Sequence, residues 1–298
     1  MRHGSIFKST DQKIEELLDS AVDNKIHLGK NTHISVTKAL IFFIIGILLV
    51  IGIWWLVAEI YNTYFIVTMS FPTPFEVFSQ LIDYLGGKTL FRATIYEHIS
   101  ASLSRWIKGF LLGALIGIII GFIISLKDSL YQIGIVPINI LQMIPGLAWL
   151  PVAILLFGFG ENSAIFMVGV VAISPLAISV SSGLRRVPQV NKRVAKMSGL
   201  SRLDTLTDVL LPFATLDILS GLRISIGSSW RMIIAAEMVV GVAVGLGFCI
   251  SSTSASLNYV ASFVCIVIIC IIGLIIDKLV LQSVEKYTRR KMGFQEDF

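Results

Sequence analysis

Charged residues are scarce in this chain. Asp, Glu, Lys and Arg make up 14% of its 298 residues, against about 25% in an average soluble domain. Hydrophobic residues make up 55% of the chain, and its mean hydropathy is +0.84. A chain this poor in charge cannot cover a surface that faces water. We therefore exclude a soluble globular protein and expect an integral membrane protein.

Cysteine and histidine are also few. The three cysteines, Cys249, Cys265 and Cys270, lie in or beside apolar segments, and they form neither an even-numbered disulfide framework nor a CxxC metal motif. We interpret them as small buried hydrophobic residues. The four histidines all fall outside the long apolar segments.

Motifs of hydrolases and metalloenzymes are missing, since neither HExxH nor GxSxG occurs. The stretch Gly86-Gly87-Lys88-Thr89 resembles the end of a phosphate-binding loop, but Ile82 stands where that loop needs its first glycine. We interpret the stretch as a turn that ends a helix. We predict no catalytic residues, no metal site and no cofactor bound by this chain. A membrane-embedded enzyme is the alternative that these absences support least.

Long apolar runs are abundant. Six segments are long enough for the roughly 20 residues that cross a hydrocarbon core about 30 Å thick. They are residues 39–61, 105–126, 130–157, 163–183, 213–242 and 259–281. We predict an all-α membrane protein with about six transmembrane helices, in which a membrane domain at 39–285 lies between cytoplasmic tails at 1–38 and 286–298.

Proline and glycine mark two of these spans. The third contains Pro137, Pro145 and Pro151, which predicts a broken or kinked helix covered by protein or lining a water-filled cavity. The second has a glycine at every fourth position, and small residues on one helical face let another helix approach closely. These glycines are Gly109, Gly113, Gly117 and Gly121.

Shorter segments lie outside the spans. Residues 13–20, 74–85 and 94–103 have the apolar periodicity of short amphipathic helices. Residues 241–256 are rich in small residues, and we predict a loop there. No signal peptide is expected, because the first apolar run begins only near Leu40 and is too long for one.

Lys and Arg are distributed unevenly between the two sides that six spans define. Both termini, the turn at 127–129 and the segment 185–212 share one side, which holds 18 of the 24 Lys and Arg residues. The other side has only four, between residues 88 and 108. An excess of Lys and Arg marks the cytoplasmic side. We therefore expect both termini and the segment 185–212 in the cytoplasm.

The polar segment 185–212 interrupts the apolar sequence between the fourth and fifth spans. One side of a first short helix can be covered by Val194, Ala195, Met197 and Ser198. Gly199 can then turn the chain, because glycine accepts a positive φ without a Cβ clash. Apolar residues at three- and four-residue steps predict a second short helix, and Pro212 would end it and begin the next span. Two such helices at the membrane surface form a shape that can dock into a partner.

This segment resembles the cytoplasmic EAA loop in the permease subunits of bacterial and archaeal ABC importers. That loop has Glu-Ala-Ala, a glycine four residues after the last alanine, and Leu-Pro about a dozen residues later. The residues here are Arg193-Val194-Ala195, Gly199 and Leu211-Pro212. The alanine, the glycine and the Leu-Pro pair match in type and spacing. Arg193 replaces the glutamate that usually pairs with the ATPase, and Val194 replaces the first alanine.

Other segments are similar to the sulfonate, nitrate and taurine branch of these importers. They are the proline-rich third span with Phe157-Gly158 and Glu161 after it, Gly221-Leu222-Arg223, Ala235-Ala236-Glu237, and Gly245-Leu246-Gly247. The resemblance covers residues 40–285 and implies the type I, MetI-like importer fold in the inner membrane of a prokaryote. It also implies a permease homodimer, an extracytoplasmic substrate-binding protein, and ATPase subunits that bind ATP and receive the helices at 187–211.

The fifth span carries the residues that we consider for the translocation pathway, Arg223, Trp230, Arg231 and Glu237. Ionisable groups in a span are costly, and they tend to face the bundle interior or a water-filled cavity. Two buried arginines would suit a small anion of the sulfonate, nitrate or taurine type. The alternative is that these groups pair between helices and only hold the bundle together.

An ion-coupled secondary transporter is the alternative function. Such proteins often carry broken helices at matching positions of two repeated halves. Here the third span contains prolines and the sixth does not, so we see no such repeat. Transport without an ATPase partner would favour this alternative.

Overall fold

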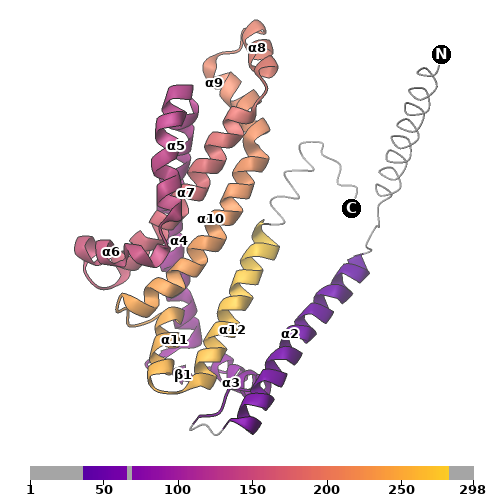
Figure 1. Cartoon of the computed structure of the whole chain (residues 1–298), viewed down its shortest axis with the longest axis vertical. Helices are drawn as coiled ribbons and strands as arrows, with labels where there is room; N and C mark the ends of the chain where they lie inside the picture. The colour runs from indigo at the N-terminus through magenta and orange to yellow at the C-terminus, as the bar shows by residue number, and fades with distance from the viewer. Residues whose placement is uncertain (1–35, 66–68, 282–298) are drawn as a thin grey trace, which may run out of the picture. The chain divides into compact units, whose positions relative to one another are not determined.

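A computed structural model of the chain describes residues 36–65 and 69–281 (Figure 1). The chain divides into two units within helix α2 (Val36–Tyr64), one with residues 1–53 and 295–298 and the other with residues 54–294. The helix predicted at 13–20 and the tail at 286–298 lie outside the described residues, as does most of the tail at 1–38.

Five described helices are long and apolar enough to cross a membrane, and a bent pair adds a sixth span. The five are α2, α4 (Ile95–Ser125), α7 (Glu161–Arg186), α10 (Leu211–Val239) with the π-helical η2 (Thr205–Leu210), and α12 (Tyr259–Ile275). The bent pair is α5 (Asp128–Met143) with the helices after it. The prediction of an all-α fold with about six spans is confirmed.

The first unit exposes the apolar side chains of α2. From Leu40 to Ile53 nearly every described side chain is exposed, and most of them are Ile, Leu, Val or Phe. Such a surface is stable in hydrocarbon, because lipid tails are as apolar as the side chains themselves. This part of α2 is therefore suited to contact with lipid.

In the second unit, α7 packs along both α4 and α10 (Figure 1). A methyl group added at Gly109, Gly117 or Gly121 of α4 would lie 2.5–2.7 Å from a backbone carbonyl oxygen of α7. A methyl group added at Gly113 would lie even closer to the carbonyl oxygen of Gly169. The close helix approach predicted from the four-residue glycine spacing is confirmed, and α7 is the partner helix.

The third span is broken where the prolines predicted it. Helix α5 ends at Met143, a 3₁₀ turn η1 covers Gly146–Trp149, and α6 (Leu150–Phe157) leaves at a bend of 100°. Pro145 lies in the break and Pro151 in the first turn of α6, whereas Pro137 is accommodated inside α5. Figure 1 shows α6 turned away from the direction of α5.

Short elements precede α4. Helix α3 (Pro74–Leu85) has the predicted bounds, and Thr73 and Glu76 form a capping box at its start. The helix ends in a turn that contains Gly87 at φ +98°, as the interpretation of Gly86-Gly87-Lys88-Thr89 predicted. Strands β1 (Thr89–Leu90) and β2 (Ala93–Thr94) then form a small antiparallel hairpin, with Thr89 opposite Thr94 and Leu90 opposite Ala93.

The prediction of a separate helix at 94–103 is wrong, because α4 runs without a break from Ile95 to Ser125. Thr94 and Glu97 form a capping box at its start. His98, Ser102 and Arg105 make its first turns polar, yet all three are buried within the second unit. The polar residues therefore mark an internal contact of a long helix and not the surface of a short one.

The prediction of a loop over 241–256 is also wrong, because α11 (Leu246–Ala255) occupies most of it. Its small polar side chains bond back to the helix. The hydroxyl of Thr253 donates to the carbonyl of Cys249 at 2.6 Å, and that of Ser251 donates to the carbonyl of Phe248 at 3.0 Å. Their polar groups are satisfied without water, so the segment is stable as a helix.

An aromatic contact joins α4 to α10 in the core of the second unit. The indole N–H of Trp106 donates to the hydroxyl of Ser229 at 3.0 Å, and its ring packs edge-on against Trp230 at 5.6 Å. Cys249 and Cys265 are buried in this core, as expected, whereas Cys270 is exposed.

Candidate functional site

The polar segment folds into two short helices joined at a glycine. Helix α8 covers Gln189–Met197, and α9 (Arg202–Asp204) follows. Gly199 has φ +73°, and its N–H and that of Leu200 donate to the carbonyls of Lys196 and Ala195, both at 3.2 Å. This pair of bonds is the Schellman arrangement, which favours glycine at the left-handed position.

The second helix is capped directly after this turn. The Ser201 N–H donates to the Asp204 carboxylate at 3.2 Å, and the Asp204 N–H donates to the Ser201 hydroxyl, also at 3.2 Å. A reciprocal cap of this kind satisfies two backbone N–H groups at the start of the helix. The turn between α8 and α9 is therefore specified on both sides of Gly199.

Pro212 lies in the first turn of α10, as predicted for the start of the fifth span, but it does not end the helix before it, so that part of the prediction is wrong. Helix α9 continues through the π-helical η2 into α10, and the Leu211 N–H donates to the carbonyl of Leu206, five residues back. A proline ring clashes with the carbonyl four residues before it in a regular α-helix. We attribute the passage of the helix through Pro212 to this wider turn, since insertions of this kind occur inside helices.

The outer face of α8 is apolar and exposed. Val190, Val194 and Met197 recur at four- and three-residue steps, and their exposed fractions are 65%, 54% and 87%. Ala195 points inward and is 3% exposed, so the four residues expected to share one side do not. Arg193 is exposed beside Val194.

Ion pairs tie the base of the polar segment to the neighbouring helices. Arg186 at the end of α7 pairs with Asp217 of α10 at 2.5 Å. Arg185 pairs with Asp128 of α5 at 2.6 Å and lies over the ring of Tyr131 at 4.2 Å. Two arginines in the last turn also complement the dipole of α7.

Three of the four residues predicted for the pathway, Arg223, Trp230 and Arg231, line one groove between α10 and the end of α12, and Glu237 is not among its lining residues. Arg223 makes two hydrogen bonds, of 2.9 and 3.0 Å, to the two carboxylate oxygens of Asp277 in η3 (Ile276–Leu281). Trp230 is buried, and its indole N–H has no partner among the described residues. Arg231 is exposed, and no described acidic residue forms an ion pair with it.

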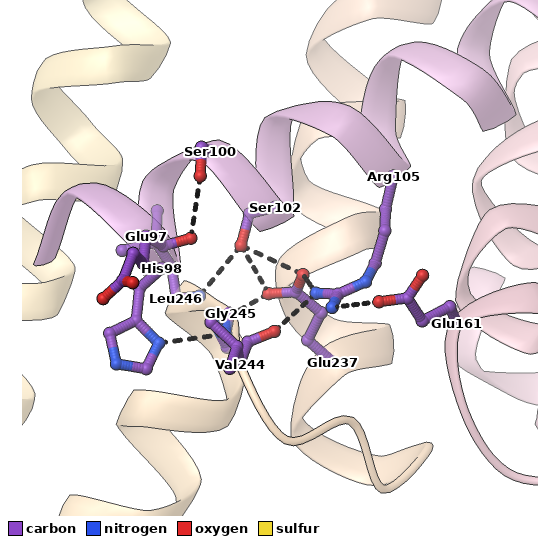
Figure 2. A network of polar contacts seen from close by, with 11 residues as sticks. Glu97, His98, Ser100, Ser102, Arg105, Glu161, Glu237, Val244, Gly245 and Leu246 are labelled. Carbon is purple, nitrogen blue, oxygen red and sulfur yellow. Dashed lines mark hydrogen bonds and ion pairs between the residues drawn. The ribbon is translucent and has the colours of Figure 1, made fainter. Parts of the chain in front are cut away.

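Glu237 lies in a buried polar network between α4 and α10 (Figure 2). Arg105 donates to its carboxylate at 2.7 Å, and the Ser102 hydroxyl lies 2.7 and 3.0 Å from the two carboxylate oxygens. A second nitrogen of Arg105 pairs with Glu161 at 2.7 Å. The Glu237 side chain is fully buried, whereas that of Glu161 is 60% exposed.

The loop before α11 completes this network. The Gly247 N–H donates to the Glu237 carboxylate at 3.0 Å, and Arg105 donates to the carbonyl of Val244 at 2.6 Å. A methyl group at Gly245 would lie 2.6 Å from that carboxylate. The Gly245-Leu246-Gly247 stretch therefore lets the backbone approach Glu237 closely.

His98 and Ser102 hold the same loop. The Gly245 N–H donates to Nδ1 of His98 at 3.0 Å, and the Leu246 N–H donates to the Ser102 hydroxyl at 2.8 Å. Sequence reasoning did not identify these residues or Arg105 as partners of Glu237. The only signal was that Arg105 lies at the edge of an apolar span.

Within residues 36–65 and 69–281, no group of three or more His, Cys, Asp or Glu residues is placed to hold a metal ion. The hydrogen bonds and ion pairs of the buried network join α4, α10 and the loop at 244–247.

Residues 113–289 match the family described as "binding-protein-dependent transport system inner membrane component". The taurine transport system permease protein TauC of Escherichia coli is 33% identical over 76% of this chain and 80% of its own length. The nitrate import permease protein NrtB of Leptolyngbya laminosa is 33% identical over 85% and 88%. The bicarbonate transport system permease protein CmpB of Synechococcus elongatus is 34% identical over 70% and 77%.

Solved structures share the fold at lower identity. An inward-facing structure of the methionine ABC transporter MetNI has a TM-score of 0.55 and 19% identity, over 66% of this chain and 95% of that one. An amino acid ABC transporter has a TM-score of 0.56 and 14% identity, over 73% and 100%. The chain belongs to the inner membrane component family of binding-protein-dependent transport systems, and it is a permease of an ABC importer.

Proposed function

We propose that two copies of this permease form the pathway for a small solute that carries an oxyanion group, and that an ATPase docks on α8 and drives its import. Taurine, nitrate and bicarbonate, which the relatives' names give as their solutes, all fit this class. The chain itself is non-catalytic and binds no cofactor in this proposal. ATP is bound by the partner ATPase, and an extracytoplasmic binding protein delivers the solute.

The observation that carries the docking proposal is the exposed apolar face of α8. Val190, Val194 and Met197 lie on a helix that is otherwise polar. Exposed apolar side chains at three- and four-residue steps are suited to a groove in a partner protein. Arg193, which replaces the motif glutamate, adds a positive charge at the edge of this face, so we propose an acidic group on the ATPase opposite it.

The connections of α8 and α9 would pass their movement into the membrane. Only the stretch Val187–Pro188 separates α8 from α7, and α9 is continuous with α10 through η2. Arg186 and Asp217 also tie the end of α7 to α10. ATP binding can drive transport only if the ATPase dimer favours one orientation of these helices over the other.

The distribution of Lys and Arg supports the orientation in which both tails, the turn at 127–129 and the segment 185–212 are cytoplasmic. We place the protein in the inner membrane of a prokaryote, with the membrane domain at 39–285 between tails at 1–38 and 286–298. The coupling surface is then the segment 185–212, including Gly199 and the Leu211-Pro212 pair.

For the pathway, Arg231 is the strongest of the four candidates, because it is exposed, forms no ion pair with a described acidic residue, and a guanidinium inside a span needs water or an anion. Trp230 and Arg223 lie beside it, along the same groove between α10 and the end of α12. The contacts of Arg223 with Asp277 and of Glu237 with Arg105 support the alternative role of holding helices together.

Crosslinking from α8 tests the docking proposal. A photo-crosslinker attached through Met197→Cys, at a position 87% exposed, is expected to capture an ABC ATPase subunit in cells. The matched control is Phe75→Cys, since Phe75 of α3 is 84% exposed and lies on the side assigned to the cell exterior. If the α8 position never captures an ATP-hydrolysing protein, the docking proposal is wrong. Uptake that persists without the ATPase would instead support a secondary transporter.

Gly199→Val is expected to abolish most ATP-driven uptake while the protein still inserts into the membrane. A β-branched residue at φ +73° costs about 1–2 kcal/mol, which would move α8 relative to α9 without unfolding the spans. Gly87→Val is the control, because Gly87 also has a positive φ after a helix and nothing lies within 4 Å of an added methyl group at either glycine. Uptake in reconstituted vesicles is the measurement, and unchanged uptake in Gly199→Val would contradict its role as a joint.

A further inference from the structure

A cavity of about 270 Å³ lies where the third span breaks. It is open on one side, and it is lined by the end of α5 with the break at Ile144–Pro145, by the middle of α7 at Ser174–Pro175, and by the middle of α10 at Ile224 and Ser228. Pockets for drug-sized ligands measure about 300–1,000 Å³. This cavity therefore suits a solute of a few heavy atoms.

Ser174 is the group that points to a ligand. Its side chain is 2% exposed and lines the cavity, yet its hydroxyl makes no hydrogen bond with any residue in the described part of the chain. Serines inside helices usually bond back to a carbonyl, as Ser181 of α7 does with Ile178 at 3.0 Å. The hydroxyl is not among the buried atoms that lack a partner, so it is accessible from the cavity and can bond to water or to a ligand there.

The other polar groups of the cavity are neutral donors. Gln142, which is exposed, and the half-buried Trp149 line it, and neither side chain makes a hydrogen bond to a described residue. Ser228 lines the cavity as well, but its hydroxyl donates to the carbonyl of Ile224 at 2.9 Å. A cavity with free donors suits an atom group that accepts hydrogen bonds.

Positive charge lies next to the cavity and not inside it. None of the described side chains that line it is ionisable. Ile224, Ser228 and Arg231 follow one another at four- and three-residue steps and so share a face of α10. An anion drawn by Arg231 could therefore move one helical turn to neutral donors. Such a site binds weakly enough to release its ligand, as conduction requires.

We propose that this cavity binds the oxyanion group of the transported solute, and that the Ser174 hydroxyl and the Gln142 amide donate hydrogen bonds to it. The proposal rests on the proposed function, because it assigns a place on the import pathway. It makes Ser174 a residue that determines affinity for the solute inside the membrane.

The test places a thiol in the cavity by Ser228→Cys, in a background with Cys270→Ser. The remaining thiols are buried, and a hydrogen bond with Cys265 together with burial raises the pKa of Cys249 far above its ordinary value. An anionic methanethiosulfonate reagent then reports the introduced thiol by mass. Taurine, nitrate and bicarbonate are the probes, used with the permease in nanodiscs.

At least one probe is expected to slow the modification by roughly tenfold when its concentration is ten times its dissociation constant. Adding Ser174→Ala should remove most of this protection. Ser181→Ala is the matched control, since it makes the same change in the same helix at a hydroxyl that already has a partner. Ser181→Ala should leave the protection intact.

The cavity assignment is overturned if the thiol does not react, if none of the three probes protects it, or if Ser174→Ala is protected as well as wild type. Ile224→Cys, at another residue that lines the cavity and has no proposed contact with the solute, serves as a second reporter if Ser228→Cys fails to insert. ATP-dependent uptake by wild-type vesicles separates the two proposals. If ATP-dependent uptake occurs but no probe protects the thiol, only the assignment of the cavity as a solute site is refuted. If uptake by wild type does not depend on ATP, the proposed function is refuted.

Discussion

Arg105→Gln is expected to destabilise the membrane domain by about 3–5 kcal/mol, the usual effect of removing one partner of a buried ion pair. Glu237 is fully buried, and Arg105 is the cation that pairs with it. Without Arg105 the carboxylate keeps its bonds to Ser102 and to the Gly247 N–H but has no counter-charge. The destabilisation therefore comes from leaving the Glu237 carboxylate without a counter-charge in a low-dielectric interior.

The acidic partners of Arg105 are expected to differ in effect. Glu237→Gln should be milder than Arg105→Gln, because Arg105 keeps its ion pair with Glu161 and its bond to the Val244 carbonyl. Glu161→Gln should cost about 0–1 kcal/mol, since the Glu161 side chain is 60% exposed and water screens the pair.

The measurement is the apparent melting temperature in detergent, read by a dye that reacts with Cys249 and Cys265 as they become exposed, in a Cys270→Ser background. The double variant Arg105→Gln with Glu237→Gln should be more stable than Arg105→Gln alone, because no buried charge is left unpaired and Glu161, which also loses Arg105, is 60% exposed to water. Equal melting temperatures for Arg105→Gln and Glu161→Gln would show that the buried pair does not hold α4 to α10.

Features set by neighbouring residues were predictable from the sequence. Thr73, Pro74 and Glu76 fix the start of α3 through a capping box, and Pro145 fixes the break after α5. Gly199 adopts the left-handed conformation because the last turn of α8 needs it. Caps, proline breaks and glycine turns involve residues at most a few positions apart. Their spacing in the sequence therefore predicts their geometry in the fold.

Features that depend on distant partners were not predictable in this way. Arg105 and Glu237 are 132 residues apart, and Arg223 and Asp277 are 54 apart. Periodicity shows which helical face is polar but not whether that face meets water or another helix. This is why the first turns of α4 were predicted as a separate surface helix, although His98 is buried inside the second unit.

Backbone bonding by small polar side chains was a second source of error. In α11 the hydroxyls of Ser251 and Thr253 return to carbonyls of the same helix, so a stretch with a loop-like composition is helical. The π-helical turn before Pro212 also makes a local signal misleading. It lets a proline, which usually ends a helix, lie inside a continuous one.

Gly113→Ala is expected to lower the apparent melting temperature by about 2–12 °C, from an overpacking cost of about 1–3 kcal/mol. The added methyl group would overlap the carbonyl of Gly169 and the side chain of Ala172 in α7. Backbone cannot rotate away as a flexible side chain can, so α4 and α7 would have to separate. The same change at Gly117 or Gly121 should act in the same direction, because each also faces a carbonyl of α7.

Gly46→Ala in α2 is the matched control for this change. It adds the same methyl group to a glycine inside an apolar helix, but nothing described lies within 4 Å of it. Alanine is a better helix former than glycine by about 1 kcal/mol, so this variant should keep or raise the melting temperature. The same gain in helix propensity applies at Gly113. Only contact with α7 can turn the change in stability at Gly113 from a gain into a loss. A Gly113→Ala protein as stable as Gly46→Ala would mean that α4 and α7 have room between them, which the four glycine positions do not allow.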